Sequence, residues 1–287
     1  MSSHILVCPF RKDVFTRFEE KTFVIRSDDP NEIASIPQAV RDSNNTLHSV
    51  FLTLDTPLSR ISSFEEWKGI PLSLQVPEIG DFLEFAKRLH IVQGLNLRVF
   101  LPLEKEENYL SLRILSSLCI RTTIVFGGRD IDWETLSDLV TYALLGKVPH
   151  AGIEPFHHIA ETYAADRRTE IGTVYFDDPS RYLHLDDRGN VSLTSGDLSA
   201  GRFIAESISD LPDLENCPAY LERLDTWKDS LLQGADCACC EGWRICLGRF
   251  SSRRNHSPGC KRFFTEFIEL VEQYQSMREK LGVPCRA

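Results

Sequence analysis

The chain has 287 residues, of which 42% are hydrophobic and 26% are charged. These proportions are typical of a globular protein of one or two domains, and they exclude a disordered, collagenous or coiled-coil chain. The formal net charge of −10 argues against nucleic-acid binding, which needs a cationic surface. No apolar run approaches the roughly 20 residues that span a bilayer, and the first apolar stretch is too short for a signal peptide. We therefore expect a soluble, cytoplasmic protein without a membrane partner.

The first half of the chain alternates between short apolar runs and amphipathic runs. The amphipathic runs predict helices at residues 79–90, 109–118 and 132–145, the last with Asp132 as its N-cap. Strand followed by helix, repeated several times, is the pattern of a parallel sheet covered by helices. Both a partial (β/α) barrel and a doubly wound sheet fit this pattern. The apolar runs predict strands at residues 5–9, 22–26, 49–54, 72–76, 95–101 and 122–126.

The pattern changes after Pro155, and we place the boundary between the two regions near residues 165–180. Turn residues at 186–190 predict a hairpin between strands at 182–185 and 191–193. An apolar stripe at helical spacing predicts a C-terminal core helix over residues 261–281. The remaining predictions are a strand at 172–176 and helices at 156–163 and 220–232.

Seven of the nine cysteines fall in the last quarter of the chain. In a cytoplasmic chain such a cluster indicates a metal site before it indicates disulfides. Cys237, Cys240, Cys246 and Cys260 have the spacing C-x2-C-x5-C-x13-C, which suits an all-thiolate set for Zn²⁺ or for an iron–sulfur cluster. The alternative is reduced thiols without a metal. We assign no role to the other five, which are Cys8, Cys119, Cys217, Cys239 and Cys285.

Basic residues gather around the cysteines. Residues 241–262 hold six basic side chains and one acidic one. Such a patch can stabilise an anionic cluster or receive an acidic partner, and a solvated loop explains it equally well. The six are Arg244, Arg249, Arg253, Arg254, Lys261 and Arg262.

A second candidate site consists of acidic and histidine side chains at strand ends. Asp55, Glu154, His157 and His158 could act as acids or bases at the mouth of a barrel. Neighbouring residues on a helix point about 100° apart, so one helix cannot aim both histidines at one metal. We expect the histidines to pack at the edge of the core.

The C-x2-C-x5-C spacing resembles the core of the SPASM domain, the C-terminal auxiliary-cluster domain of radical S-adenosylmethionine (radical SAM) peptide-modifying enzymes. The hairpin from Tyr182, the helix containing Trp227, and Cys260 followed by Arg262-Phe263-Phe264 resemble the flanks of that domain. The preceding strand–helix alternation resembles the partial (β/α)6 barrel of the same enzymes. The resemblance is carried by motifs in residues 180–275 and by pattern alone in residues 45–165.

The chain lacks the catalytic cysteine motif of this family. In the family, C-x3-C-x2-C follows the first barrel strand and holds the cluster that cleaves S-adenosylmethionine. Here that position reads Asp55-Thr-Pro-Leu-Ser-Arg60, without a cysteine. Two further family cysteines are replaced, one around Ser192-Leu193 and one at Phe250. The resemblance therefore implies a pseudo-radical-SAM protein that binds no S-adenosylmethionine and retains at most one auxiliary metal site.

We expect an α/β fold in three parts. Residues 1–45 form N-terminal strands or a recognition segment, residues 46–175 a partial (β/α) TIM-like barrel of radical SAM type, and residues 176–287 a small SPASM-like domain with a C-terminal helix. The resemblance implies a non-catalytic accessory protein in ribosomal peptide natural-product maturation. It would bind one [4Fe-4S] cluster, or alternatively Zn²⁺, and a precursor peptide or a catalytic maturation enzyme. The alternatives are an enzyme that uses the barrel mouth and a zinc-stabilised binding module.

Overall fold

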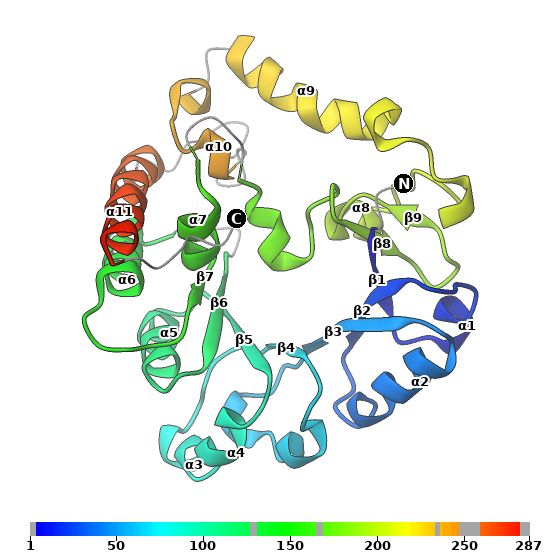
Figure 1. Ribbon diagram of the computed structural model, residues 1–287, viewed down its shortest axis with the longest axis horizontal. Helices are drawn as coiled ribbons and strands as arrows, with labels where there is room; N and C mark the ends of the chain where they lie inside the picture. The colour runs from blue at the N-terminus through cyan, green and yellow to red at the C-terminus, as the bar shows by residue number, and fades with distance from the viewer. Residues whose placement is uncertain (1–3, 127–130, 165–168, 233–235, 247–258, 282–287) are drawn as a thin grey trace. The chain divides into compact units, whose positions relative to one another are not determined.

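The computed structural model describes residues 4–126, 131–164, 169–232, 236–246 and 259–281. It has an α/β fold whose mostly parallel sheet contains nine strands in these ranges (Figure 1). The α/β class predicted from the sequence is therefore confirmed. No helix among the described residues is long and apolar enough to cross a membrane.

The chain divides into two compact units, each built from two separate segments. Unit 1 comprises Met1–Pro102 and Tyr175–Tyr220, and unit 2 comprises Leu103–Val174 and Leu221–Ala287. All four candidate metal-binding cysteines belong to unit 2. The N-terminal strands at residues 5–9 and 22–26 belong to unit 1, where they pair with the strands that follow them.

Unit 1 contains most of the parallel sheet, in the order β5-β4-β3-β2-β1-β8-β9. The hairpin of β8 and β9 is antiparallel, and β8 lies parallel to β1. The strands are β1 (Ile5–Pro9), β2 (Thr22–Ser27), β3 (Thr46–Thr53), β4 (Leu72–Gln75), β5 (Leu97–Pro102), β8 (Tyr182–Leu185) and β9 (Val191–Ser192). The α-helices are α1 (Lys12–Phe15), α2 (Ile36–Asp42), α3 (Phe82–Ala86), α4 (Leu89–Gln93) and α8 (Ser195–Ser199). Single 3₁₀ turns are η1 (Ile33–Ser35), η2 (Leu58–Arg60), η3 (Ser63–Trp67), η5 (Ile208–Asp210) and η6 (Leu214–Asn216).

Unit 2 contributes the neighbouring parallel strands β6 (Arg121–Val125) and β7 (Ile153–Glu154). Two elements, η4 (Ile171–Tyr175) and α9 (Pro218–Leu232), lie where the chain passes from one unit to the other. The remaining elements are α5 (Glu107–Ser117), α6 (Trp133–Leu145), α7 (Phe156–Thr162), η7 (Asp236–Cys239), α10 (Trp243–Cys246) and α11 (Cys260–Lys280).

The two faces of the unit 1 sheet differ in polarity. Residues paired across a parallel sheet point to the same face, and successive residues of one strand point to opposite faces. Ile25 pairs with Val50, which pairs with Leu72, and this face is apolar and buried. The alternate row runs from Arg26 through Phe51 and Ser73 to Arg98. One face of the sheet therefore supplies core, while the other carries polar groups.

Two predicted elements differ from the structure. The predicted strand at 172–176 is wrong, because this segment forms the 3₁₀ helix η4. Glu170 starts this turn: its side chain accepts from the Gly172 amide at 3.2 Å and its carbonyl from the Thr173 amide at 3.2 Å. The predicted helix at 79–90 is two short helices, and the first begins only after Asp81.

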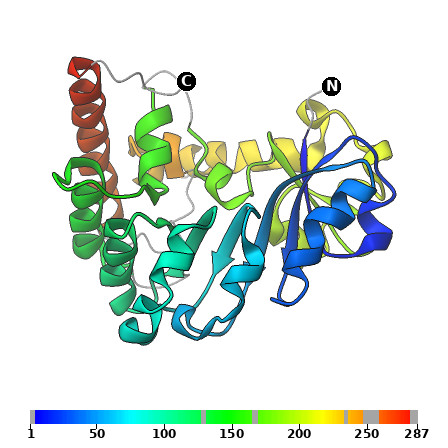
Figure 2. The ribbon, with the colours of Figure 1, turned by 60° about the horizontal axis from the view of Figure 1, so that its bottom comes forward.

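Three helices of unit 2 pack together and form the scaffold of the cysteine-rich segment. Helix α11 runs beside α6 and α7, as both views show (Figures 1 and 2). Helix α6 is capped by Asp132, whose Oδ1 accepts from the amides of Glu134 and Thr135 at 3.1 Å each. The phenyl rings of Phe156 on α7 and Phe267 on α11 lie 5.4 Å apart, centroid to centroid. These contacts fix the position at which α11 begins.

Candidate metal centre

The four predicted ligands lie in two short elements, in the residue that follows the first of them, and at the start of one long helix. Cys237 lies in η7, Cys240 follows it directly, and Cys246 is the last residue of α10. Cys260 is the first residue of α11. Cys237, Cys240 and Cys260 are half-buried, and Cys246 is buried.

Backbone hydrogen bonds fold Cys237 to Cys246 into a compact turn. The Cys240 amide donates to the Cys237 carbonyl at 3.2 Å, and the Cys246 amide donates to the Gly242 carbonyl at 2.9 Å. The amides of Gly242 and Trp243 also donate hydrogen bonds to the Cys240 thiol group. Amides aimed at sulfur favour the thiolate form, which is the form that binds metals.

Two close contacts bring the start of α11 against this turn and against α6. A Cβ at Gly242 would lie 2.3 Å from the Phe264 Cβ, and a Cβ at Gly259 would lie 2.5 Å from the Trp133 ring. Both approaches are possible only for glycine. Because Phe264 is one helical turn beyond Cys260, the first contact places Cys260 beside the turn that carries Cys240.

Three of the four thiols are close enough for their charges to interact. The pKa of Cys260 is raised to about 12, first by burial and then by the neighbouring thiols of Cys240 and Cys237. Burial also raises the pKa of Cys240, and the charge of Cys237 adds to the increase. The Lys261 ammonium and the two turn amides oppose it. Without a metal, the raised pKa values of Cys240 and Cys260 therefore favour the protonated form of these two thiols.

The arrangement among the described residues is not itself a metal site. No group of three or more His, Cys, Asp or Glu side chains in these ranges is placed to hold a metal ion. The soft thiol donors nevertheless suit zinc or iron–sulfur chemistry, and the amide hydrogen bonds to sulfur are those that such a site needs. Cys246 is buried at the end of α10.

The predicted basic patch is described only in part. Arg262 forms an ion pair with Glu266 at 2.7 Å, and the Arg244 carbonyl accepts from the Thr169 amide at 3.1 Å. Lys261 is exposed. Arg249, Arg253 and Arg254 lie outside the described residues, as do Phe250 and Cys285, and the side chain of Trp227 is not described.

The other four described cysteines are either buried or exposed. Cys8 is fully buried on β1, and burial raises its pKa to about 12. Cys217 is also buried. Cys119 and Cys239 are exposed.

The second candidate set has structural partners. The Glu154 carboxylate accepts from the His158 amide at 2.9 Å at the start of α7, and His157 Nδ1 accepts from the Ile153 amide at 3.0 Å. Burial lowers the pKa of His157 and favours its neutral form. Asp55 is an exposed residue of unit 1. His157 thus packs at the edge of the core, as expected, while the catalytic role of this set stays a prediction.

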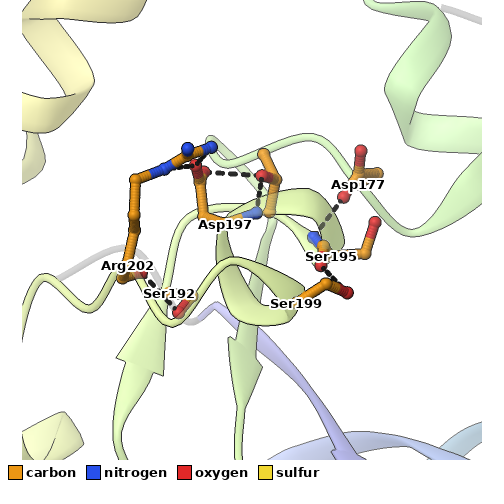
Figure 3. Close-up of polar contacts among 7 residues, drawn as sticks. Asp177, Ser192, Ser195, Asp197, Ser199 and Arg202 are labelled. Atoms are coloured by element: carbon orange, nitrogen blue, oxygen red, sulfur yellow. Dashed lines mark hydrogen bonds and ion pairs between the residues drawn. The ribbon is translucent and has the colours of Figure 1, made fainter.

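Ser192 of the β8–β9 hairpin is part of a hydrogen-bonded polar cluster (Figure 3). Ser192 Oγ donates to the Arg202 carbonyl at 2.8 Å, and the Arg202 guanidinium binds Asp197 Oδ1 at 2.6 and 2.8 Å. Asp177 accepts from the Ser195 amide at 2.8 Å. These hydrogen bonds connect α8 and the residues that follow it to β9 and to the segment before β8.

Comparisons with protein-family models and with curated proteins find no match to this chain.

Proposed function

We propose that this chain is a non-catalytic, radical-SAM-like accessory protein that binds one [4Fe-4S] cluster, or alternatively Zn²⁺, through Cys237, Cys240, Cys246 and Cys260. The observation that carries the proposal is the close approach of Gly242, in the turn that follows Cys240, to Phe264, one helical turn beyond Cys260. In this arrangement the thiols of Cys240 and Cys237 add to the raised pKa of Cys260. Unrelated core cysteines have no reason to gather beside amides that point at sulfur.

The strand order supports the finer fold assignment, a partial barrel of radical SAM type. In unit 1, β1 to β5 are neighbours in chain order, and β8 lies parallel to β1 on the other side. A doubly wound sheet reverses its order at a switch point, whereas a (β/α) barrel adds strands in one direction and returns its last strand to its first. The chain order of β1 to β5 and the parallel pairing of β8 with β1 support the second form, while β7 and β9 lie at the two edges of the sheet among the described residues.

The bound group would be structural. Four thiolates fill a tetrahedral metal site or the four iron positions of a cluster, so no open position remains for a substrate. The group would covalently join the turn from Cys237 to Cys246 with the start of α11. The chain's own residues would contribute the amide donors of Gly242 and Trp243 and the Lys261 charge near Cys240.

The partner is proposed from the resemblance to peptide-modifying enzymes. A chain that keeps their barrel and lacks their catalytic cysteines can hold a precursor peptide, or a catalytic maturation enzyme, without acting on it. Co-purification of a radical SAM enzyme with the tagged chain from its native cells would support this role. Recovery of the chain without such a partner, under conditions where known complexes of this kind survive, would count against it.

Metal analysis of anaerobically purified protein tests the site. We expect broad absorbance near about 400 nm with about four irons per chain for a cluster, or about one zinc and no colour for zinc. Cys260→Ser should lose the metal, whereas the matched variant Cys119→Ser, which changes an exposed cysteine of the same unit, should keep it. Wild-type protein that holds no metal, and that folds equally well as Cys260→Ser, would refute the proposal.

A further inference from the structure

A groove opens in unit 2 between the start of α6 and the first turns of α11. Its volume is about 440 Å³, within the range of sites that take small ligands. Trp133, which is partly exposed, supplies the aromatic surface of the groove, and the buried Phe263 packs against it with ring centroids 5.3 Å apart. Gly259 forms part of the wall, one residue before Cys260. The groove therefore adjoins the candidate metal centre without using its thiols.

Carboxylates outnumber cations around this groove. Glu134 and Asp138 project from α6, and Glu266 projects from α11. The one guanidinium in the lining, that of Arg262, already donates to Glu266 Oε1 at 2.7 Å. Among the described residues, no hydrogen bond or ion pair engages the carboxylate of Asp138. The groove thus has an excess of negative charge that its own residues do not neutralise.

Helix stability explains only part of this charge. Glu134 lies in the first turn of α6, where the helix dipole favours an acidic side chain. Asp138 lies beyond that turn and four residues after Glu134, a spacing at which two like charges repel. A cation bound between the two carboxylates would remove this repulsion. The negative charges of Glu134 and Asp138 therefore favour a bound cation more than they stabilise α6.

We propose that this groove binds the guanidinium of an arginine side chain in the peptide or protein partner of this chain. A guanidinium stacks flat on an aromatic ring and forms paired hydrogen bonds with carboxylates, and the groove offers both kinds of surface. A lysine ammonium can use the carboxylates but gains less from the aromatic wall. The inference rests on the proposed function for the existence of a partner, and it concerns the groove alone.

Calorimetric titration with short peptides tests the inference. The probe is acetyl-Gly-Arg-Gly-amide, compared with peptides that carry citrulline or lysine in place of arginine. Citrulline keeps the planar shape but has no charge. We expect the arginine peptide to bind, the lysine peptide to bind more weakly, and the citrulline peptide to give no measurable heat. Binding of the arginine peptide should weaken as salt is raised, because the carboxylates are exposed.

Matched variants locate the binding. Glu134→Gln with Asp138→Asn should weaken binding of the arginine peptide at least about tenfold. The control, Glu269→Gln with Glu279→Gln, makes the same change in net charge on exposed parts of α11 outside the groove lining, and should bind like wild type. Circular dichroism verifies that both variants are folded.

Three results would overturn the inference: no binding of the arginine peptide, equal binding of the citrulline peptide, or unchanged affinity after the groove substitutions. None of these substitutions touches a thiol. If the protein binds its metal but not the arginine peptide, this inference is wrong and the proposed function is unaffected. If the protein binds the arginine peptide in the groove but no metal, this inference holds and the proposed function is wrong.

Discussion

Replacing Gly242 with alanine tests the packing that holds Cys240 beside Cys260. Gly242 is buried, and an added Cβ would lie 2.3 Å from the Phe264 Cβ and 2.6 Å from its Cγ. Carbon atoms that are not bonded to each other rest about 3.5–4.0 Å apart. The Cβ of Phe264 is attached to the backbone of α11, so a side-chain rotation cannot relieve the overlap. The backbone of α10 or α11 must move instead.

The expected cost follows from this geometry. Overpacking a buried site costs about 1–3 kcal/mol, and a contact that only backbone movement can relieve belongs in the upper half of that range. A loss of about 2–3 kcal/mol lowers the folding equilibrium constant by roughly 30- to 160-fold. The movement also separates the Cys240 turn from Cys260, so the affinity for metal should fall together with stability.

Urea denaturation followed by circular dichroism measures the change in free energy of unfolding. The matched control is Gly196→Ala in α8, where the added Cβ would lie 3.8 Å from Thr194 Oγ1, an ordinary contact. Alanine is the better helix former, so this control should be neutral or more stable by about 0.5–1 kcal/mol. If Gly242→Ala unfolds at the same urea concentration as wild type, the inferred approach of the turn to α11 is wrong.

Three further predictions concern caps and thiols. Asp132→Ala should cost about 1 kcal/mol at pH 7 by removing the α6 cap. The Thr135 hydroxyl and the α6 amides lower the pKa of Asp132, so the ionised cap stabilises the protein above about pH 4 and this stabilisation is lost as pH falls further. The difference in free energy of unfolding between wild type and Asp132→Ala, measured in urea melts, should therefore disappear at low pH. Burial and the neighbouring thiols raise the pKa of Cys260 to about 12, so this thiol must release its proton when it binds a metal. The affinity for cadmium, followed by thiolate absorbance, should therefore increase about tenfold per pH unit between pH 6 and 8 for each proton released. An affinity that does not depend on pH would contradict this prediction. Iodoacetamide should label exposed Cys119 rapidly in native protein and buried Cys8 only after unfolding, as peptide mass mapping can determine, and equal rates would show that Cys8 is accessible.

Local sequence signals predicted much of the fold. Strands β1 and β8 have the predicted bounds because each is a short apolar run closed by turn residues. Asp132 was recognisable as a cap because an acidic residue directly precedes an apolar stripe at helical spacing. The delayed start of α3 had a signal too: Gly80 adopts a φ of 77°, and Asp81 caps the helix through the amides of Leu83 and Glu84.

The prediction failed where a nearby hydrogen bond outweighed residue preference. Thr173, Val174 and Tyr175 favour strands, yet Glu170 closes a 3₁₀ turn over them. Preference for strand is weak and depends on the availability of a partner strand. Among the described residues, η4 pairs with no strand.

The candidate site was predictable in part. Cysteine spacing identifies four thiols, but it does not show which helix meets their turn. Gly242 and Gly259 lie at close approaches to Phe264 and Trp133. Such a contact joins segments that are distant in the chain, and a single sequence contains no signal for it. The groove between α6 and α11, which we propose to bind arginine, was not predicted from the sequence for the same reason, because its two walls are distant in the chain.

The discontinuous construction of unit 2 has a consequence for synthesis on the ribosome. The apolar face shared by α6 and α7 is covered by Phe263, Phe267 and Val271 of α11. Helix α11 begins about 100 residues after α7 ends, and translation at about 5–20 residues per second makes that interval roughly 5–20 s. During this time the nascent chain presents an uncovered hydrophobic surface to its surroundings. A holdase chaperone that recognises such surfaces would find its target there, and would have to release it when α11 emerges.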